Sequence, residues 1–184
     1  MSRFATRCPN CSAPVAFAWS QSVQTICASC RSIVVRHDVN VQALGQVADV
    51  PADLSPIQVG TRGRFDGRTF EVVGRIVYEY EDGGWNEWHV VFGDGDSGWL
   101  SDAQAQYAVS QPATNRPALP SAKDLKPGQR YHWHDREYVA STITRARYAA
   151  VEGELPFETW NRELATFADF NTVSGHFATV DYSE

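Results

Sequence analysis

Short runs of alternating apolar and polar residues, separated by glycine-rich turns, fill the middle of this chain. Two of them, residues 69–80 and 85–92, are rich in β-branched and aromatic residues and flank the turn Asp82-Gly83-Gly84. Runs of this length and composition predict antiparallel strands joined in hairpins. Further short runs lie at residues 97–100 and 107–109. About five such strands predict a small, barrel-like antiparallel β-unit over residues 57–110.

The run over residues 69–80 does not keep a strict two-residue period. Its phase changes at Gly74. Glycine inside a strand often marks a bulge or a sharp bend. We therefore expect a bulge or bend at Gly74 that lets this strand take part in two sheets.

The last third of the chain repeats features of the first unit. The segment from Trp133 to Val139 resembles that from Phe65 to Val72, and Asp124 to Gly128 resembles Asp53 to Pro56. Self-similarity of this kind indicates repeated structural units. We expect a second β-unit over residues 121–184 that arose by internal duplication.

Two patterns compete near the C-terminus. Trp160, Leu164 and Phe167 have helical spacing, whereas residues 165–170 and 177–182 read as paired strands. We predict the hairpin. Its final strand would lie at an exposed edge, where it could pair with a protein partner or a second copy of the chain.

Before the first β-unit, the pattern predicts a small N-terminal lobe. This segment holds two Cys-x-x-Cys pairs, a spacing typical of zinc sites, and residues 15–19 and 33–36 read as short strands within a zinc ribbon over residues 1–38. Small residues and prolines predict linkers over residues 39–56 and 111–120. The predicted fold class is therefore mainly β, with a zinc ribbon followed by two barrel-like antiparallel units.

Composition narrows the choice of partners. The 184 residues carry 16 lysines and arginines against 22 acidic residues, a formal net charge of -6. This balance disfavours nucleic acid as a general partner, because phosphate neutralisation needs a dense positive face. The arginines at 62, 64, 68 and 75 are expected on solvated faces. No apolar run reaches the roughly 20 residues that cross a bilayer.

The four cysteines form two Cys-x-x-Cys pairs, which are Cys8, Cys11, Cys27 and Cys30. Each pair can occupy a tight turn that directs two thiolates at one point, and two such turns supply the all-sulfur tetrahedron that zinc accepts. Four protein ligands leave no open coordination position. The spacing therefore predicts a structural Zn²⁺ that holds together a lobe too small to bury its own core.

Two other uses of the cysteines remain open. An even cysteine count also fits two disulfides in a secreted module. No apolar segment follows Met1 to Arg7, so no signal peptide is visible, and we expect a cytoplasmic protein with reduced thiols. Thioredoxin-like redox chemistry would leave the second pair without a purpose.

Several segments carry a family resemblance: Gly60 to Phe65, Phe70 to Arg75, Trp85 to Trp88, Gly98 to Leu100 and Gly153 to Phe157. On these motifs, the chain from about Leu54 to Tyr182 resembles the bacterial domain of unknown function 4178 family. The resemblance implies a zinc ribbon ahead of the domain and a setting among membrane-stress and polyamine-related proteins. It implies no activity.

The best candidate for catalysis is the pair Glu87 and His89. Two residues apart on a strand, their side chains share one face and could act as a general acid and base, although a structural role fits equally. Asp94 and Asp96 resemble part of a calcium loop but fit a glycine hairpin better. His132 and His134 lack a third ligand nearby. We expect that the protein is not an enzyme.

We therefore expect a non-catalytic, zinc-binding interaction or adaptor protein. Tryptophans exposed on a β-unit would form an anchor for a protein partner, and the candidates are Trp85, Trp88, Trp99 and Trp133. A nucleic-acid-binding ribbon, supported by Arg7, Arg31 and Arg36, is one alternative. An enzyme of unknown type centred on Glu87 and His89 is the other.

Overall fold

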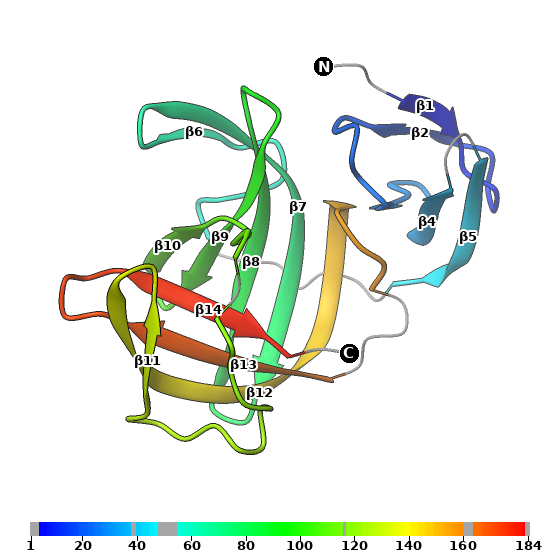
Figure 1. The fold of residues 1–184 in the computed structure, drawn as a ribbon. Coiled ribbons are helices and arrows are strands. Elements are labelled where there is room, and N and C mark those ends of the chain that lie inside the picture. Colours follow the sequence, from blue (N-terminus) through cyan, green and yellow to red (C-terminus); the bar gives the residue numbers. More distant parts are fainter. Residues whose placement is uncertain (1–3, 38–39, 48–54, 116, 160–163, 183–184) are drawn as a thin grey trace. The chain divides into compact units, whose positions relative to one another are not determined.

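Strands joined by turns and loops make up the residues that this computed structural model describes, which are 4–37, 40–47, 55–115, 117–159 and 164–182. No helix occurs within these ranges, which confirms the predicted β class. The strands are β1 Phe4–Arg7, β2 Pro14–Phe17, β3 Gln24–Ile26, β4 Ser32–His37, β5 Asn40–Gln46, β6 Arg62–Phe65, β7 Arg68–Tyr80, β8 Gly83–Phe92, β9 Ser97–Ala103, β10 Gln106–Ser110, β11 Arg130–Trp133, β12 Arg136–Leu155, β13 Leu164–Asn171 and β14 Phe177–Asp181 (Figure 1).

The chain divides into two compact units that interleave along the sequence. Unit 1 comprises Met1–Tyr78, Gly84–Gln111 and Ala149–Asn161, and unit 2 comprises Glu79–Gly83, Pro112–Tyr148 and Arg162–Glu184. The long strands β7, β8 and β12 therefore contribute residues to both units. The domain boundaries expected from the sequence stay a prediction.

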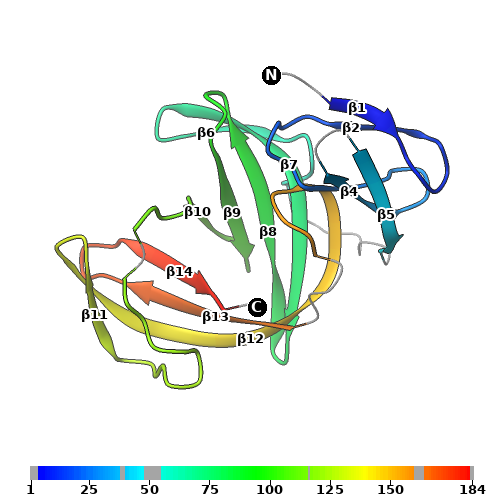
Figure 2. The same ribbon diagram turned by 45° about the vertical axis from the view of Figure 1, so that its right-hand side comes forward.

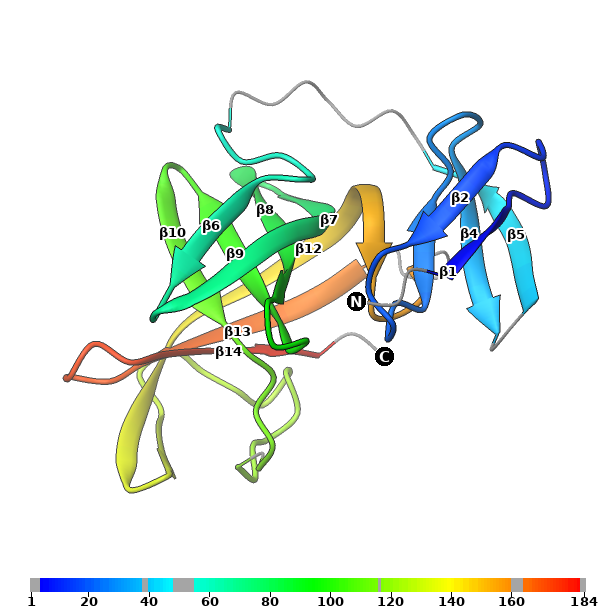
Figure 3. The same ribbon diagram turned by 90° about the horizontal axis from the view of Figure 1, so that it is seen from above.

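In unit 1, the strand order is β10-β9-β8-β7-β12-β3-β4-β5, with β6 paired to β7 (Figure 2). In unit 2, β11 and β13 pair with β12, and β14 pairs with β13 (Figure 3). The order in unit 1 ends at β10 and β5 without returning on itself. Among the described strands, the antiparallel units are thus open sheets without the barrel-like closure that we expected from the strand number.

The N-terminal lobe of unit 1 is larger than the predicted ribbon. The hairpin β1–β2 and the strands β3, β4 and β5 surround a small core of Cys8, Val15, Phe17, Cys27 and Val34. Residues 40–46, which we expected in a linker, form β5 and pair with β4. Their mixture of small and polar residues suits an edge strand with one half-buried face. Residues 48–54 of the predicted linker lie outside the described residues.

Gly74 lies where two backbones come unusually close within unit 1. A Cβ atom at Gly74 would lie 2.1 Å from the carbonyl oxygen of Glu154, and one at Gly153 would lie 2.3 Å from that of Val73. β7 continues through Gly74, with Val72 to Ile76 all buried. The loss of alternation in the sequence therefore reflects burial on both faces and close contact with β12.

The predicted internal repeat is confirmed by matching hydrogen bonds. In residues 57–103, here repeat A, Gly60 N donates to Val72 O and Val72 N donates to Thr61 O. In residues 125–182, repeat B, Gly128 N donates to Ala140 O and Ala140 N donates to Gln129 O. Each of these positions in repeat B follows its equivalent in repeat A by 68 residues. The structure thus aligns Ile57 with Leu125, whereas the sequence comparison had placed Leu125 opposite Leu54.

The second hairpin of each repeat also matches, at a different spacing. Phe92 N donates to Asp96 O in repeat A, and Thr172 N donates to His176 O in repeat B, 80 residues further on. Repeat B therefore contains 12 additional residues between its two hairpins. These residues fall around the end of β12, in the segment Ala149–Asn161 that belongs to unit 1.

Replacement of Gly153 by alanine should destabilise the protein more than replacement of Gly60. Both glycines have positive φ, so each alanine costs about 1–2 kcal/mol of backbone strain. Only Gly153→Ala adds a clash with the β7 backbone, because nothing lies within 4 Å of a Cβ at Gly60. We expect an extra loss of about 2 kcal/mol or more in the free energy of unfolding, measured by denaturant titration. Equal losses in the two variants would refute the close approach.

Candidate metal centre

The four cysteines lie on two turns that have the same backbone structure. In the first, Cys8 N donates to Ala13 O and Ser12 N donates to Cys8 O; in the second, Cys27 N donates to Ser32 O and Arg31 N donates to Cys27 O. Ser12 and Arg31 occupy equivalent positions with φ of 62° and 59°. The two Cys-x-x-Cys segments therefore fold into a matched pair of turns, each of which presents two sulfurs.

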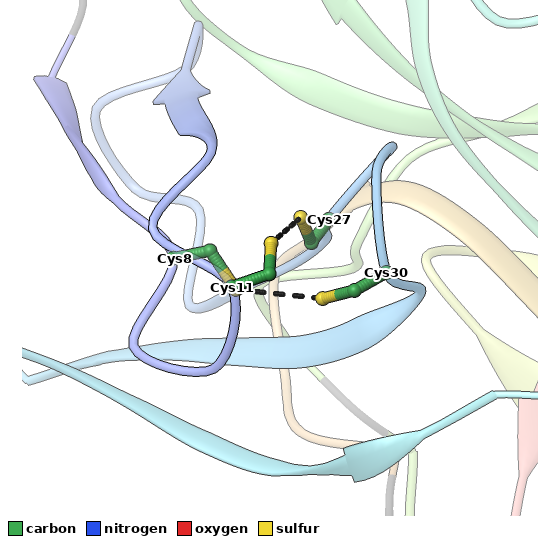
Figure 4. A group of neighbouring side chains, drawn as sticks. All are labelled: Cys8, Cys11, Cys27 and Cys30. Atoms are coloured by element: carbon green, nitrogen blue, oxygen red, sulfur yellow. Dashed lines mark hydrogen bonds between the residues drawn. The ribbon is translucent and has the colours of Figure 1, made fainter.

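The four sulfurs converge on one point (Figure 4). All of them lie within 4.8 Å of one another, and the pairs Cys8–Cys30 and Cys11–Cys27 are 3.7 Å apart. A tetrahedron with Zn–S bonds of about 2.3 Å has sulfurs about 3.8 Å apart, so the spacing fits that geometry. A disulfide requires about 2.05 Å. The cysteines are free thiols, and the group could hold a metal ion.

Polar groups around Cys30 stabilise its thiolate form. Ser32 forms hydrogen bonds with its sulfur through both the side chain and the backbone, and these contacts lower the pKa of the Cys30 thiol to about 6. Asn10 Nδ2 lies 3.6 Å from the same sulfur and 2.9 Å from Ser32 Oγ. Cys11 differs: the backbone N–H of Ala13 lowers its pKa, but hydrogen bonds with the other cysteines raise it to about 12. A bound cation would remove this conflict by neutralising the thiolates.

Glu154, near the end of β12, joins the cysteine lobe to the rest of unit 1. Its buried carboxylate accepts hydrogen bonds from Ala18 N at 2.6 Å, Trp19 N at 3.1 Å and Ser22 Oγ at 2.6 Å. The backbone of Glu154 also pairs with Thr25 of β3. A buried carboxylate is tolerated only when its oxygens are satisfied, so these contacts hold the segment that follows β2 in one position.

His89 lies next to this junction and is fully buried. Its Nδ1 lies 2.9 Å from Glu154 O, and its ring packs against those of Trp19 and Trp99 at centroid distances of 5.0 and 5.2 Å. Because a carbonyl only accepts, Nδ1 carries the proton. Burial lowers the pKa of His89 to about 4. His89 is therefore neutral at physiological pH and ties β8 to β12.

Glu87, the proposed catalytic partner of His89, has different neighbours. Its carboxylate accepts hydrogen bonds from Trp85 Nε1 at 3.0 Å and Ser101 Oγ at 2.9 Å. His89 instead donates to a backbone carbonyl. Both residues hold neighbouring parts of the sheet in place.

The other candidate residues are dispersed. Asp94 and Asp96 form the predicted hairpin turn, where both bind the guanidinium of Arg68, which lowers the pKa of Asp94. His132 is exposed on β11, 3.9 Å from Glu137, whereas His134 lies in the following turn against Trp133.

The four candidate tryptophans occupy different environments. Trp88 is fully buried in the core of unit 1, beneath the guanidinium of Arg75, and is not available to a partner. Trp85 stacks on Tyr78, and Trp99 packs against His89. Trp133, in unit 2, donates from Nε1 to Asn115 O. Partner binding through Trp85, Trp99 and Trp133, which are half-buried, stays a prediction.

Residues 58–183 match the family model described as a domain of unknown function, DUF4178. The chain belongs to this family. The match begins after the four cysteines, so the metal centre rests on its own geometry. No curated protein and no solved structure matches the chain. Among the described residues, no helix is long and apolar enough to cross a membrane.

Sequence reasoning assigned no role to Glu154, although this residue lies in the Gly153 to Phe157 motif that carried the family resemblance. One signal was present: Glu152 and Glu154 flank Gly153 within a mainly apolar stretch of strand. Buried acids of this kind need several donors. The donors come from residues 18–22, which are more than 130 positions away, and spacing alone cannot connect them.

Replacement of Cys27 by serine should abolish tight metal binding. Cys27 is 1% exposed, and its loss leaves three thiolates and a weak hydroxyl ligand. We expect the wild-type protein to hold about one zinc ion per chain and the variant to hold close to none, as measured by elemental analysis. The control is Ser29→Ala, an exposed position between Cys27 and Cys30 that should not change zinc content. Full zinc occupancy in Cys27→Ser would contradict the four-sulfur site.

His89 should make stability fall in acid. Its pKa is about 4 in the folded protein and about 6.5 when unfolded, so between these values the unfolded chain binds the extra proton. Stability from this group is complete above pH 6.5 and decreases by about 3 kcal/mol as the pH falls to 4. Denaturant titrations across this range should show a smaller decrease for His89→Asn, which keeps an N–H donor for Glu154 O. An unchanged pH profile would refute the neutral, buried state of His89.

Proposed function

We propose that this protein is a non-catalytic, zinc-stabilised interaction protein that binds other proteins in the cytoplasm. The convergence of four sulfurs on one point, in a lobe fastened to a β-sheet by Glu154, is the observation that carries the proposal. Thiolate ligands favour zinc over harder divalent cations such as magnesium and calcium. Four protein ligands complete the tetrahedron, so the ion would stabilise the lobe and leave no position for substrate.

The charged candidates for chemistry support a non-catalytic role. Glu87 binds Trp85 and Ser101, Asp94 binds Arg68, and His89 is buried beside a carbonyl. General acid–base catalysis needs such groups to reach a substrate proton. Each of them already has a structural partner.

The arginines support a protein partner over nucleic acid. Arg62 binds Glu71, and Arg68 binds Asp94 and Asp96. Arg75 is buried and binds Asn86 and Glu152, which differs from the solvated position that we expected. Near the cysteines, Arg7 and Arg36 donate to backbone carbonyls of Ser12 and Ser20. The carboxylates paired with Arg62 and Arg68 offset their positive charge and leave less of it for phosphates.

The edges of the open sheets are the surfaces through which the protein would bind a partner. Within the described strands, β10, β5 and β14 each pair with a single neighbour. Such edges present unpaired backbone groups that can accept a strand from another protein. This surface does not depend on a cluster of exposed tryptophans.

Affinity capture with the zinc-loaded protein should test this function. We expect a defined host protein, or a second copy, to be retained in fixed stoichiometry after nuclease treatment, since the contacts are protein to protein. Capture by Ser29→Ala should equal that of wild type, and binding of nucleic acid measured at two salt concentrations should be weak. Recovery of nuclease-sensitive material alone, or of nothing while the protein stays monomeric at high concentration, would overturn the proposal.

A further inference from the structure

The internal repeat provides two versions of the same sheet edge. In repeat A, the strand β9 forms a hairpin with β8, and its other side pairs with β10. In repeat B, the equivalent strand is β14, which forms the matching hairpin with β13. Among the described strands, β14 has no second neighbour. Repeat A thus shows which kind of element fits the outer side of this edge.

The hydrogen-bond pattern shows which groups of β14 face outward. Tyr182 N donates to Thr166 O and Thr172 N donates to His176 O, so even-numbered residues of β14 bond to β13. In an antiparallel pair the intervening residues direct N–H and C=O to the other side. Phe177 and Thr179 therefore present their backbone groups at the outer edge, and both residues are exposed.

The cores of the two repeats show which side chain an outer strand such as β10 contributes to the core. In repeat A, Leu100 of β9 lies opposite Val109 of β10, and both pack with Val72. The equivalent of Leu100 in repeat B is Val180, which packs against the core that contains Ala140. Among the described residues no strand equivalent to β10 follows β14, and Leu119, from the segment before β11, packs against that core from outside the hairpin.

We infer that the outer edge of β14 binds an extended segment of a partner protein that resembles β10: an antiparallel strand with a β-branched residue opposite Val180 and small or polar residues beside it. This inference rests on the proposed function and names the partner for one of its edges. Backbone bonds to Phe177 and Thr179 would hold the segment, and the apolar side chain opposite Val180 would give specificity.

A synthetic peptide with the sequence of residues 105–111 tests this inference on the full-length, zinc-loaded protein. At saturation, amide exchange at Phe177 and Thr179 should slow by about tenfold or more. A peptide with aspartate in place of the valine should not protect them. The same segment, fused after Glu184 through a Gly/Ser linker, raises the effective concentration and detects weak binding. No protection in either format would overturn the inference.

A protein variant supplies the matched control. Thr179→Pro removes an outward N–H and the long side-chain bond to Ala168 O, but it leaves the backbone bonds to β13, so the edge strand should stay folded. We expect the variant to lose peptide protection at Phe177, whereas Thr179→Val should keep it. Equal protection in both variants, or protection that needs no peptide and rises with protein concentration, would overturn the inference. If the peptide fails while the protein still retains a partner in affinity capture, the proposed function stands.

Discussion

The arrangement of unit 1 depends on one buried carboxylate. Glu154 is 7% exposed, and a carboxylate in such a place costs several kilocalories per mole unless donors surround it. Its three donors come from the chain after β2, which has no regular secondary structure of its own to fix it. The same residue accepts the His89 bond through its backbone and lies against Gly74. The side chain of Glu154 therefore positions the cysteine lobe, and the backbone of Glu154 positions β7 and β8.

Local features of the fold could be predicted from the sequence because each has a short-range cause. The Cys-x-x-Cys turns, the hairpins at Asp66-Gly67 and Gly93 to Asp96, and the C-terminal hairpin all follow from residues close in sequence. Long-range pairings could not be predicted in this way. Barrel closure was expected from strand number alone, but closure depends on which edges meet. Glu154 and its donors are separated by most of the chain, and the burial of Trp88 depends on both faces of its sheet.

A comparison of the two repeats shows where the cysteine lobe attaches to the duplicated fold. Repeats A and B share their turn hydrogen bonds and equivalent core positions, such as Phe70 and Tyr138. The 12 additional residues of repeat B lie around the end of β12, where Glu154 and Leu155 pair with β3. The extension thus provides both the strand and the carboxylate that receive the lobe. The contacts that attach the cysteine lobe thus come from the additional residues of repeat B. The fold that repeats A and B share does not require them.

Metal occupancy should therefore act on the two units to different degrees. The core of the cysteine lobe contains five buried residues, two of which are cysteines of the candidate metal centre, so this lobe has little apolar burial to keep it folded without an ion. If the lobe unfolded, Glu154 would lose its hydrogen-bond donors at the same time. This loss would destabilise β12 and its contact with Gly74 in unit 1. The core around Tyr138 and Phe170 draws all of its residues from unit 2. The edge strand β14, which packs on that second core, should therefore keep its fold whether or not the metal is present.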